Sequence, residues 1–144
     1  MSRNLAEEVA VLARTVGTAN STPLVTSYVS AAQSGRITLL ACLGDMASET
    51  IDVALYQGQG GSTGAKALKA ITQLAAHASN NDNIQVVLSV DVNDIDVDNG
   101  YTHVAGRCVT GGATGGTVDL IVLGAQLRYQ PASLVDAATA QVTP

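Results

Sequence analysis

Thr50-Ile51-Asp52-Val53-Ala54-Leu55-Tyr56 is the stretch of sequence that decides the fold class. Ile51, Val53 and Leu55 alternate with residues that are charged, small or aromatic. Side chains of a β-strand point to opposite faces in turn, so a period of two is typical of a strand with one buried face. The stretch therefore predicts a β-strand that packs one side on a hydrophobic core.

Further strand-forming segments lie on both sides of this stretch. They are rich in β-branched and aliphatic residues, and glycine-rich or polar joints separate them. These segments are 24–29, 36–43, 83–91, 101–110 and 117–129. The glycine-rich run 111–116 is typical of a hairpin connection between the last two. Short strands with such joints predict a mainly β protein, an antiparallel sandwich or barrel.

The N-terminal region has a different pattern. Leu5, Val9 and Leu12 recur at spacings of four and three, with two glutamates in the first turn, so residues 3–14 predict a short helix. The polar stretch 17–23 that follows is typical of a linker or extended arm.

Segment 65–76 is ambiguous. Its alanine, lysine and leucine content favours a helix. Residues 70–74 could equally form an edge strand, and both interpretations stay open.

The chain has 144 residues, which is the length of one domain. We expect an N-terminal helix and arm over 1–23, a β-sandwich domain over 24–131 and a C-terminal tail over 132–144.

Composition excludes several classes of function. Only 3% of the residues are aromatic and only 13% are charged, with 7 Lys plus Arg against 12 Asp plus Glu. So few cations cannot neutralise many phosphates, and so few aromatic rings cannot stack bases, so no nucleic-acid partner is expected. No apolar run approaches the ~20 residues of a membrane helix, so no membrane partner is expected either.

Two cysteines, Cys42 and Cys108, lie within apolar runs. Glu7 and Glu8 stand where a signal peptide needs an apolar stretch, so we expect no export signal. A protein that stays in a reducing compartment is expected to keep both cysteines as free thiols.

One motif suggests a nucleophile. Gly60-Gly61-Ser62-Thr63-Gly64 matches the G-x-S-x-G elbow that presents a catalytic serine, and His77 or His103 would have to act as the base. The strand pattern does not fit the α/β sheet on which this elbow occurs. We therefore interpret the run as a glycine-rich loop and expect no catalytic residue and no enzymatic activity.

Asp94, Asp96 and Asp98 resemble the first ligands of a calcium loop. Asn99 stands where an EF-hand needs glycine, and Ala105 stands where it needs a bidentate glutamate, so an EF-hand is excluded. A looser calcium site at a β-loop stays open.

The same aspartates have a simpler interpretation as a solvent-facing row. Ile95 and Val97 would then point inward, and residues 98–100 would form a turn in which Asn or Gly takes a positive φ. The two histidines lack the spacing of a zinc site. No metal site, cofactor-binding residue or cofactor is expected.

Several segments together resemble small structural proteins of tailed bacteriophages. The segments are Ile51–Gln57, Gly64–Leu68, Ile71–Leu74, Asp94–Val104 and Val122–Pro131. Across residues 50–131 the chain is similar to the capsid decoration, or cement, proteins of siphophages.

The resemblance implies a β-sandwich, jelly-roll-like domain that binds the outside of an icosahedral head and holds major capsid protein subunits together. It implies the virion surface as the location after synthesis in the host cytoplasm, with partners that are the major capsid protein and further copies of the chain, as dimers or trimers. It carries no catalytic residues. For residues 70–74 it implies a strand.

Two alternatives remain beside this function. One is another structural part of the phage, a head–tail connector or tail component. The other is a small β-sandwich module that binds calcium or sugar.

Overall fold

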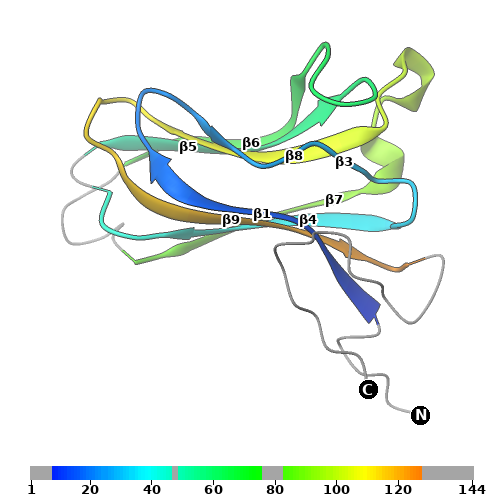
Figure 1. Ribbon diagram of the computed structural model, residues 1–144, viewed down its shortest axis with the longest axis horizontal. Helices are drawn as coiled ribbons and strands as arrows, with labels where there is room; N and C mark the ends of the chain where they lie inside the picture. Colours follow the sequence, from blue (N-terminus) through cyan, green and yellow to red (C-terminus); the bar gives the residue numbers. More distant parts are fainter. Residues whose placement is uncertain (1–7, 47–48, 76–82, 128–144) are drawn as a thin grey trace.

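The computed structural model describes residues 8–46, 49–75 and 83–127. Two antiparallel β-sheets are packed face to face in these residues, and two short 3-10 turns join β7 to β8 (Figure 1). The predicted antiparallel sandwich is confirmed.

The first sheet has four strands in the order β1-β9-β4-β7. Their bounds are β1 Val9–Ala19, β9 Gly116–Ala125, β4 Arg36–Leu43 and β7 Gln85–Asp91. The second sheet has five strands, in the order β2-β8-β5-β6 with β3 also paired to β8. Their bounds are β2 Leu24–Val25, β8 His103–Thr110, β5 Thr50–Gly58, β6 Lys66–Ala75 and β3 Val29–Ser30.

The strand pairs follow a jelly-roll order. The first strand pairs with the last, β2 and β3 pair with β8, β4 pairs with β7, and β5 pairs with β6. The chain is thus a two-stranded ribbon, closed at the β5–β6 end and wound so that successive pairs fall in alternate sheets. Winding of this kind gives the double-sheet jelly roll.

The core between the sheets is aliphatic. It has no Phe or Trp, because the chain contains none. Leu39 of β4 fills the gap left by a glycine of the facing sheet: a Cβ added to Gly106 of β8 would lie 2.5 Å from Leu39 Cδ1. The two sheets therefore interlock through a large residue set against a missing side chain.

The predicted helix over 3–14 is wrong for the described residues 9–14, which belong to β1. The register of β1 against β9 shifts between Val11 and Ala13, so Leu12 and Ala13 are both buried. This β-bulge changes the phase of the alternation, and the resulting spacing imitates a helix. The sandwich therefore begins at Val9 rather than at residue 24, and residues 1–7 lie outside the described part.

Within segment 65–76, residues Lys66–Ala75 form an edge strand, β6, rather than a helix, and residue 76 lies outside the described part. Pairing with β5 outweighs the helix-forming composition. The β5–β6 register shifts twice, and Lys69 Nζ donates a hydrogen bond to the backbone oxygen of Ser89 in β7. Bulges and lysines are devices that keep an edge strand from pairing with other chains.

The glycine-rich run 111–116 is not a hairpin loop. It joins β8 to β9, which lie in different sheets. Glu49 fixes it, because the carboxylate accepts hydrogen bonds of 3.0 Å from the backbone N–H groups of Thr114 and Gly115. The predicted strand 24–29 is also broken, into β2 and β3. The expected tail 132–144 lies outside the described residues.

We predict that Gly106→Ala lowers the free energy of unfolding by about 1–3 kcal/mol, the usual cost of overpacking a core. The reason is the clash with Leu39. Urea unfolding at equilibrium measures the loss. Leu39→Val should lower the free energy of unfolding less in the Gly106→Ala background than in the wild type. An equal loss in both backgrounds would contradict the packing argument.

Candidate functional site

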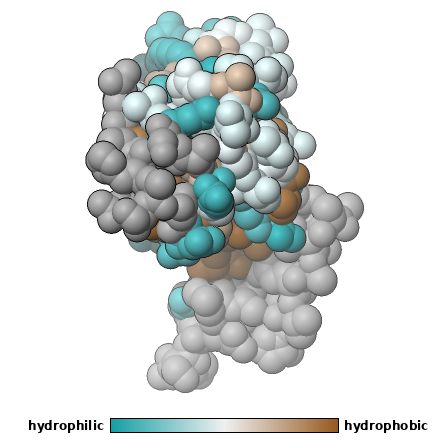
Figure 2. Space-filling view, turned by 90° about the vertical axis from the view of Figure 1, so that its left-hand side faces the viewer, coloured by the Kyte–Doolittle hydropathy of each residue, from teal (hydrophilic) through white to brown (hydrophobic). Residues whose placement is uncertain are grey.

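The outer face of the four-stranded sheet carries aliphatic side chains. We call Val16, Leu40, Val87, Ile121 and Leu123 the aliphatic face. Leu40 lies in register with Ile121 on one side and with Val87 on the other, so three aliphatic residues form a row across β9, β4 and β7. Val16 and Val87 are 55% and 59% exposed. Figure 2 shows hydrophobic surface low on the body, at the level of this sheet.

The outer face of the five-stranded sheet is different. Asp52 and Tyr56 of β5 and Arg107 of β8 point outward there. The Arg107 guanidinium lies 5.1 Å from the centre of the Tyr56 ring and donates a hydrogen bond to its hydroxyl. Partial burial raises the pKa of the neighbouring Tyr28. The outer face of the four-stranded sheet combines its aliphatic residues with charged ones, which are Arg14, Arg36, Asp91 and Asp119.

The sequence analysis did not identify the aliphatic face. Its residues come from four strands, and only the register of those strands places them together. A signal was nevertheless present. Residues 36–43 and 117–125 contain apolar residues at both odd and even positions. In a strand with one solvent-exposed face, apolar and polar residues should alternate.

Among the described residues, Ser62 and His103 of the nucleophile hypothesis do not form a catalytic pair. Ser62 is exposed in the β5–β6 loop, where Gly60, Gly61 and Gly64 have positive φ. His103 Nδ1 lies 2.9 Å from Thr102 Oγ1, and no hydrogen bond among the described residues joins it to Ser62. His77 lies outside the described part. The expectation that the chain is not an enzyme stays a prediction.

The acidic segment forms two 3-10 turns, η1 Val92–Asp94 and η2 Val97–Asn99. Ile95 between them is buried as predicted, but Val97 is 61% exposed rather than inward-facing. Gly100 ends the segment with φ +83°, which confirms the predicted turn with positive φ.

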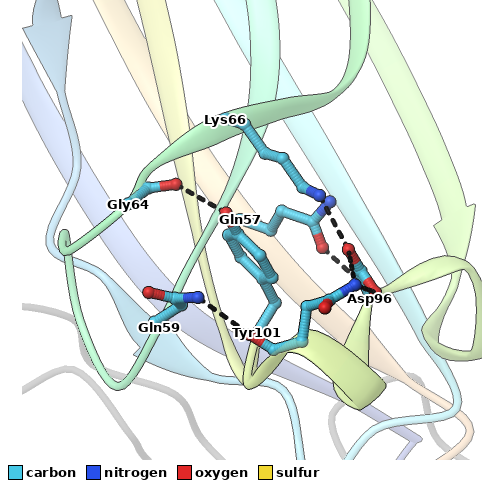
Figure 3. Close-up of polar contacts among 7 residues, drawn as sticks. Gln57, Gln59, Gly64, Lys66, Asp96 and Tyr101 are labelled. Atoms are coloured by element: carbon cyan, nitrogen blue, oxygen red, sulfur yellow. Dashed lines mark hydrogen bonds and ion pairs between the residues drawn. The ribbon is translucent and has the colours of Figure 1, made fainter.

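A polar clasp ties this segment to the β5–β6 loop (Figure 3). Lys66 Nζ lies 2.7 Å from Asp96 Oδ2 and 4.3 Å from the centre of the Tyr101 ring. The Tyr101 hydroxyl donates to the backbone oxygen of Gly64 at 2.8 Å, and Gln59 Nε2 donates to the backbone oxygen of Asn99 at 2.8 Å. The clasp holds two loops that are about 30 to 40 residues apart in sequence.

Asp96 is fully engaged in this clasp. Its two carboxylate oxygens accept hydrogen bonds from Asn99 Nδ2, and one also binds Lys66. The bond from Lys66, followed by that from Asn99, lowers the pKa of Asp96 below its ordinary value of 3.8. Within the described residues, no group of three or more His, Cys, Asp or Glu is placed to hold a metal ion. In the described residues, Asp96 is therefore engaged by Lys66 and Asn99, and the looser calcium site stays a prediction.

A recess of about 740 Å³ lies beside the clasp, between residues 31–32 and 92–102. Tyr101 lines it but is only 8% exposed, and its hydroxyl is already bonded to Gly64. Tyr101 therefore exposes little of its ring to this recess. The recess gives no support to the sugar-binding alternative.

The expectation of free thiols is confirmed for Cys42 and Cys108. Burial raises the pKa of the Cys108 thiol to about 11, with a smaller contribution from Asp52. Cys42 is half-buried on the outer side of β4, in register with Asp119 and Gln85. In the part of the chain described, no helix has the length and apolar character needed to span a membrane.

Comparison with known proteins identifies no family. No protein-family model matches the chain, and no curated protein matches it. Among solved structures, the chain is similar to a protein of Bacillus endospore appendages, described as a novel family of disulfide-linked pili. The identity is 12%, the TM-score 0.46, and the similarity covers 87% of this chain and 96% of the other.

The chain is also similar to the xylan-binding module CBM15, with 9% identity and a TM-score of 0.45, over 81% of this chain and 78% of the other. At these identities and TM-scores, the role of neither protein transfers to this chain.

We predict that Asp96→Asn lowers the melting temperature at neutral pH and that this difference from the wild type disappears in acid. The clasp needs an ionised Asp96, and its pKa in the folded protein is lowered. Its contribution is therefore complete above about pH 4 and is lost as the pH falls through the lowered pKa. Melting curves from neutral pH to well below 3.8 measure the difference.

Asp98→Asn is the matched control, because Asp98 has no ion-pair partner in the described residues and lies only two positions away. It should lower the melting temperature less at neutral pH. A difference for Asp96→Asn that persists unchanged in acid would contradict the assignment.

Proposed function

We propose that this chain is a capsid decoration protein, which binds the outer surface of a tailed-phage head and stabilises contacts between major capsid protein subunits. The observation that carries the proposal is the aliphatic face. A flat sheet surface with exposed Val16 and Val87 is suited to contact with another protein surface.

The shape and chemistry of the described residues support a role in contact. A jelly-roll ribbon closes most of its backbone hydrogen bonds within two sheets, so the domain is a rigid plate with two broad surfaces. The clasp around Asp96 and the Glu49 bonds to residues 114–115 fix long connections of this plate. A rigid plate loses little conformational freedom when it binds, which favours association.

The low charge of the chain also supports this role. Charged residues are 13% of the sequence, about half of the usual share of about 25%. Many copies on one shell lie close together, and few charges limit the repulsion between neighbours. Modest contacts repeated over many copies add up to a large stabilisation of the shell.

We predict saturable binding of the purified chain to shells assembled from the major capsid protein of the same virus. Labelled protein should sediment with the shells up to a fixed number of copies, and unlabelled protein should displace it. Decorated shells should also resist heat better than bare shells, because each bound copy bridges subunits.

Two outcomes would oppose the proposal. Absence of binding at any concentration would show that the chain is not a decoration protein of that shell. Binding as a single ring at one vertex would favour the alternative of a head–tail connector, because a decoration protein occupies positions over the whole surface.

A further inference from the structure

Asn99 is the only asparagine in the sequence that precedes a glycine. The backbone nitrogen that follows an asparagine can attack the side-chain amide, because the two groups are held close together in one chain. A side chain on the following residue hinders this approach, and Gly100 has none. Both residues are exposed, and beyond its chain neighbours no atom lies within 4 Å of where a Cβ of Gly100 would stand. The pair therefore has the sequence and the access to water that deamidation requires.

The reaction needs only the chain and one water molecule. The Gly100 nitrogen forms a bond to Asn99 Cγ, the bond from Cγ to Nδ2 breaks, and Nδ2 leaves as ammonia with the proton of the Gly100 nitrogen. Water then opens the resulting succinimide ring and leaves an aspartyl or an isoaspartyl residue at position 99. Because ammonia is lost, the change is one-way.

The clasp and the η2 turn hold the groups that would react. Gly100 N, the attacking group, donates a hydrogen bond of 2.9 Å to the Val97 backbone oxygen. Asn99 Nδ2, the leaving group, donates to the two Asp96 carboxylate oxygens at 2.9 and 3.0 Å. Gln59 Nε2 donates to the Asn99 backbone oxygen at 2.8 Å and fixes the peptide bond between the two residues. The reaction therefore requires local opening of the clasp.

The product no longer fits the clasp. Asn99 donates to Asp96, whereas a carboxylate at position 99 has no proton to donate. Two carboxylates would then lie side by side with Lys66 as their shared cation, and like charges at this distance repel. An isoaspartyl residue also lengthens the backbone by one atom, which displaces the oxygen that Gln59 binds.

We propose that Asn99 is a site of spontaneous deamidation, that the closed clasp keeps it unreacted, and that its reaction keeps the clasp open. Opening permits the reaction, and the product prevents closing. The segment 96–100 is thus a one-way switch on the contact between the β5–β6 loop and the 3-10 turns. This switch is independent of shell binding.

The test compares Asp96→Ala with Asp98→Ala, which removes a carboxylate from the same segment but from outside the clasp. The full chain is kept at neutral pH with mild warming, and peptide mapping by mass spectrometry follows the conversion of the Asn99 amide to a carboxyl. Asp96→Ala should react about three- to tenfold faster than the wild type, the effect of losing an exposed hydrogen bond to a charged group. Asp98→Ala should react at the wild-type rate. The wild type in urea gives the rate of the open chain, and the folded wild type should be slower.

Asn93 is the control within the same molecule. It is exposed and lies in η1, but Asp94 follows it, so it should stay unconverted over the same period. Methylation by an isoaspartyl methyltransferase should label position 99, because opening of a succinimide gives isoaspartyl product and direct hydrolysis of the amide does not.

A second comparison tests what the product does. Asn99→Asp should lower the melting temperature at neutral pH, and it should do so much less when Asp96 is already replaced by alanine. Asn93→Asp adds the same charge to the same acidic segment and should lower the melting temperature less. Circular dichroism checks that each variant folds.

Four outcomes would overturn the proposal. Equal rates in the folded wild type, in Asp96→Ala and in urea would show that the clasp does not control the reaction. Conversion in urea without any in folded Asp96→Ala would show the same. Conversion of Asn93 as fast as that of Asn99 would remove the role of Gly100. A melting temperature of Asn99→Asp equal to that of the wild type would show that the product leaves the clasp closed.

Discussion

The fold depends on filling the space between two sheets without large aromatic side chains. Packed sheets lie about 10 Å apart, and Phe and Trp usually span much of that distance. This chain has neither, so aliphatic residues of both sheets must interdigitate. Leu39 of the four-stranded sheet enters the gap at Gly106 of the five-stranded sheet. Within the four-stranded sheet, Leu12 of β1 lies close to Gly124 of the neighbouring β9, where an added Cβ would be 3.1 Å from its Cδ1. Small and large residues at facing positions bring the sheets into contact.

Such a core leaves long connections in need of other anchors. The chain uses polar contacts that join distant loops: the clasp around Asp96 holds the β5–β6 loop against the two 3-10 turns, and Glu49 holds the connection between the sheets. The hydrogen bonds that the ionised Glu49 carboxylate accepts lower its pKa. The bond from the Thr110 side chain has the largest effect. These anchors depend on carboxylates at the surface, so acid should loosen the loops before it disturbs the aliphatic core.

The local sequence pattern correctly predicted strands in which polar and apolar residues alternate or β-branched residues are frequent. It failed where the pairing of a strand with its neighbours decides the structure. The bounds of β4 were predicted to the residue. The β1 bulge at Leu12 and the exposed edge position of β6 both disturb the alternation, and neither is visible without β9 and β5 as partners. The run 111–116 has the composition of a hairpin loop, and only the winding of the ribbon shows that it crosses between sheets.

The candidate surface was hidden for the same reason, since Leu40, Val87 and Ile121 are distant in sequence and meet only through register. The sequence does show an excess of apolar residues in strands whose apolar and polar residues should alternate. An apolar surface of this kind gains free energy when another surface removes it from water. Association is therefore the activity that we propose for this surface.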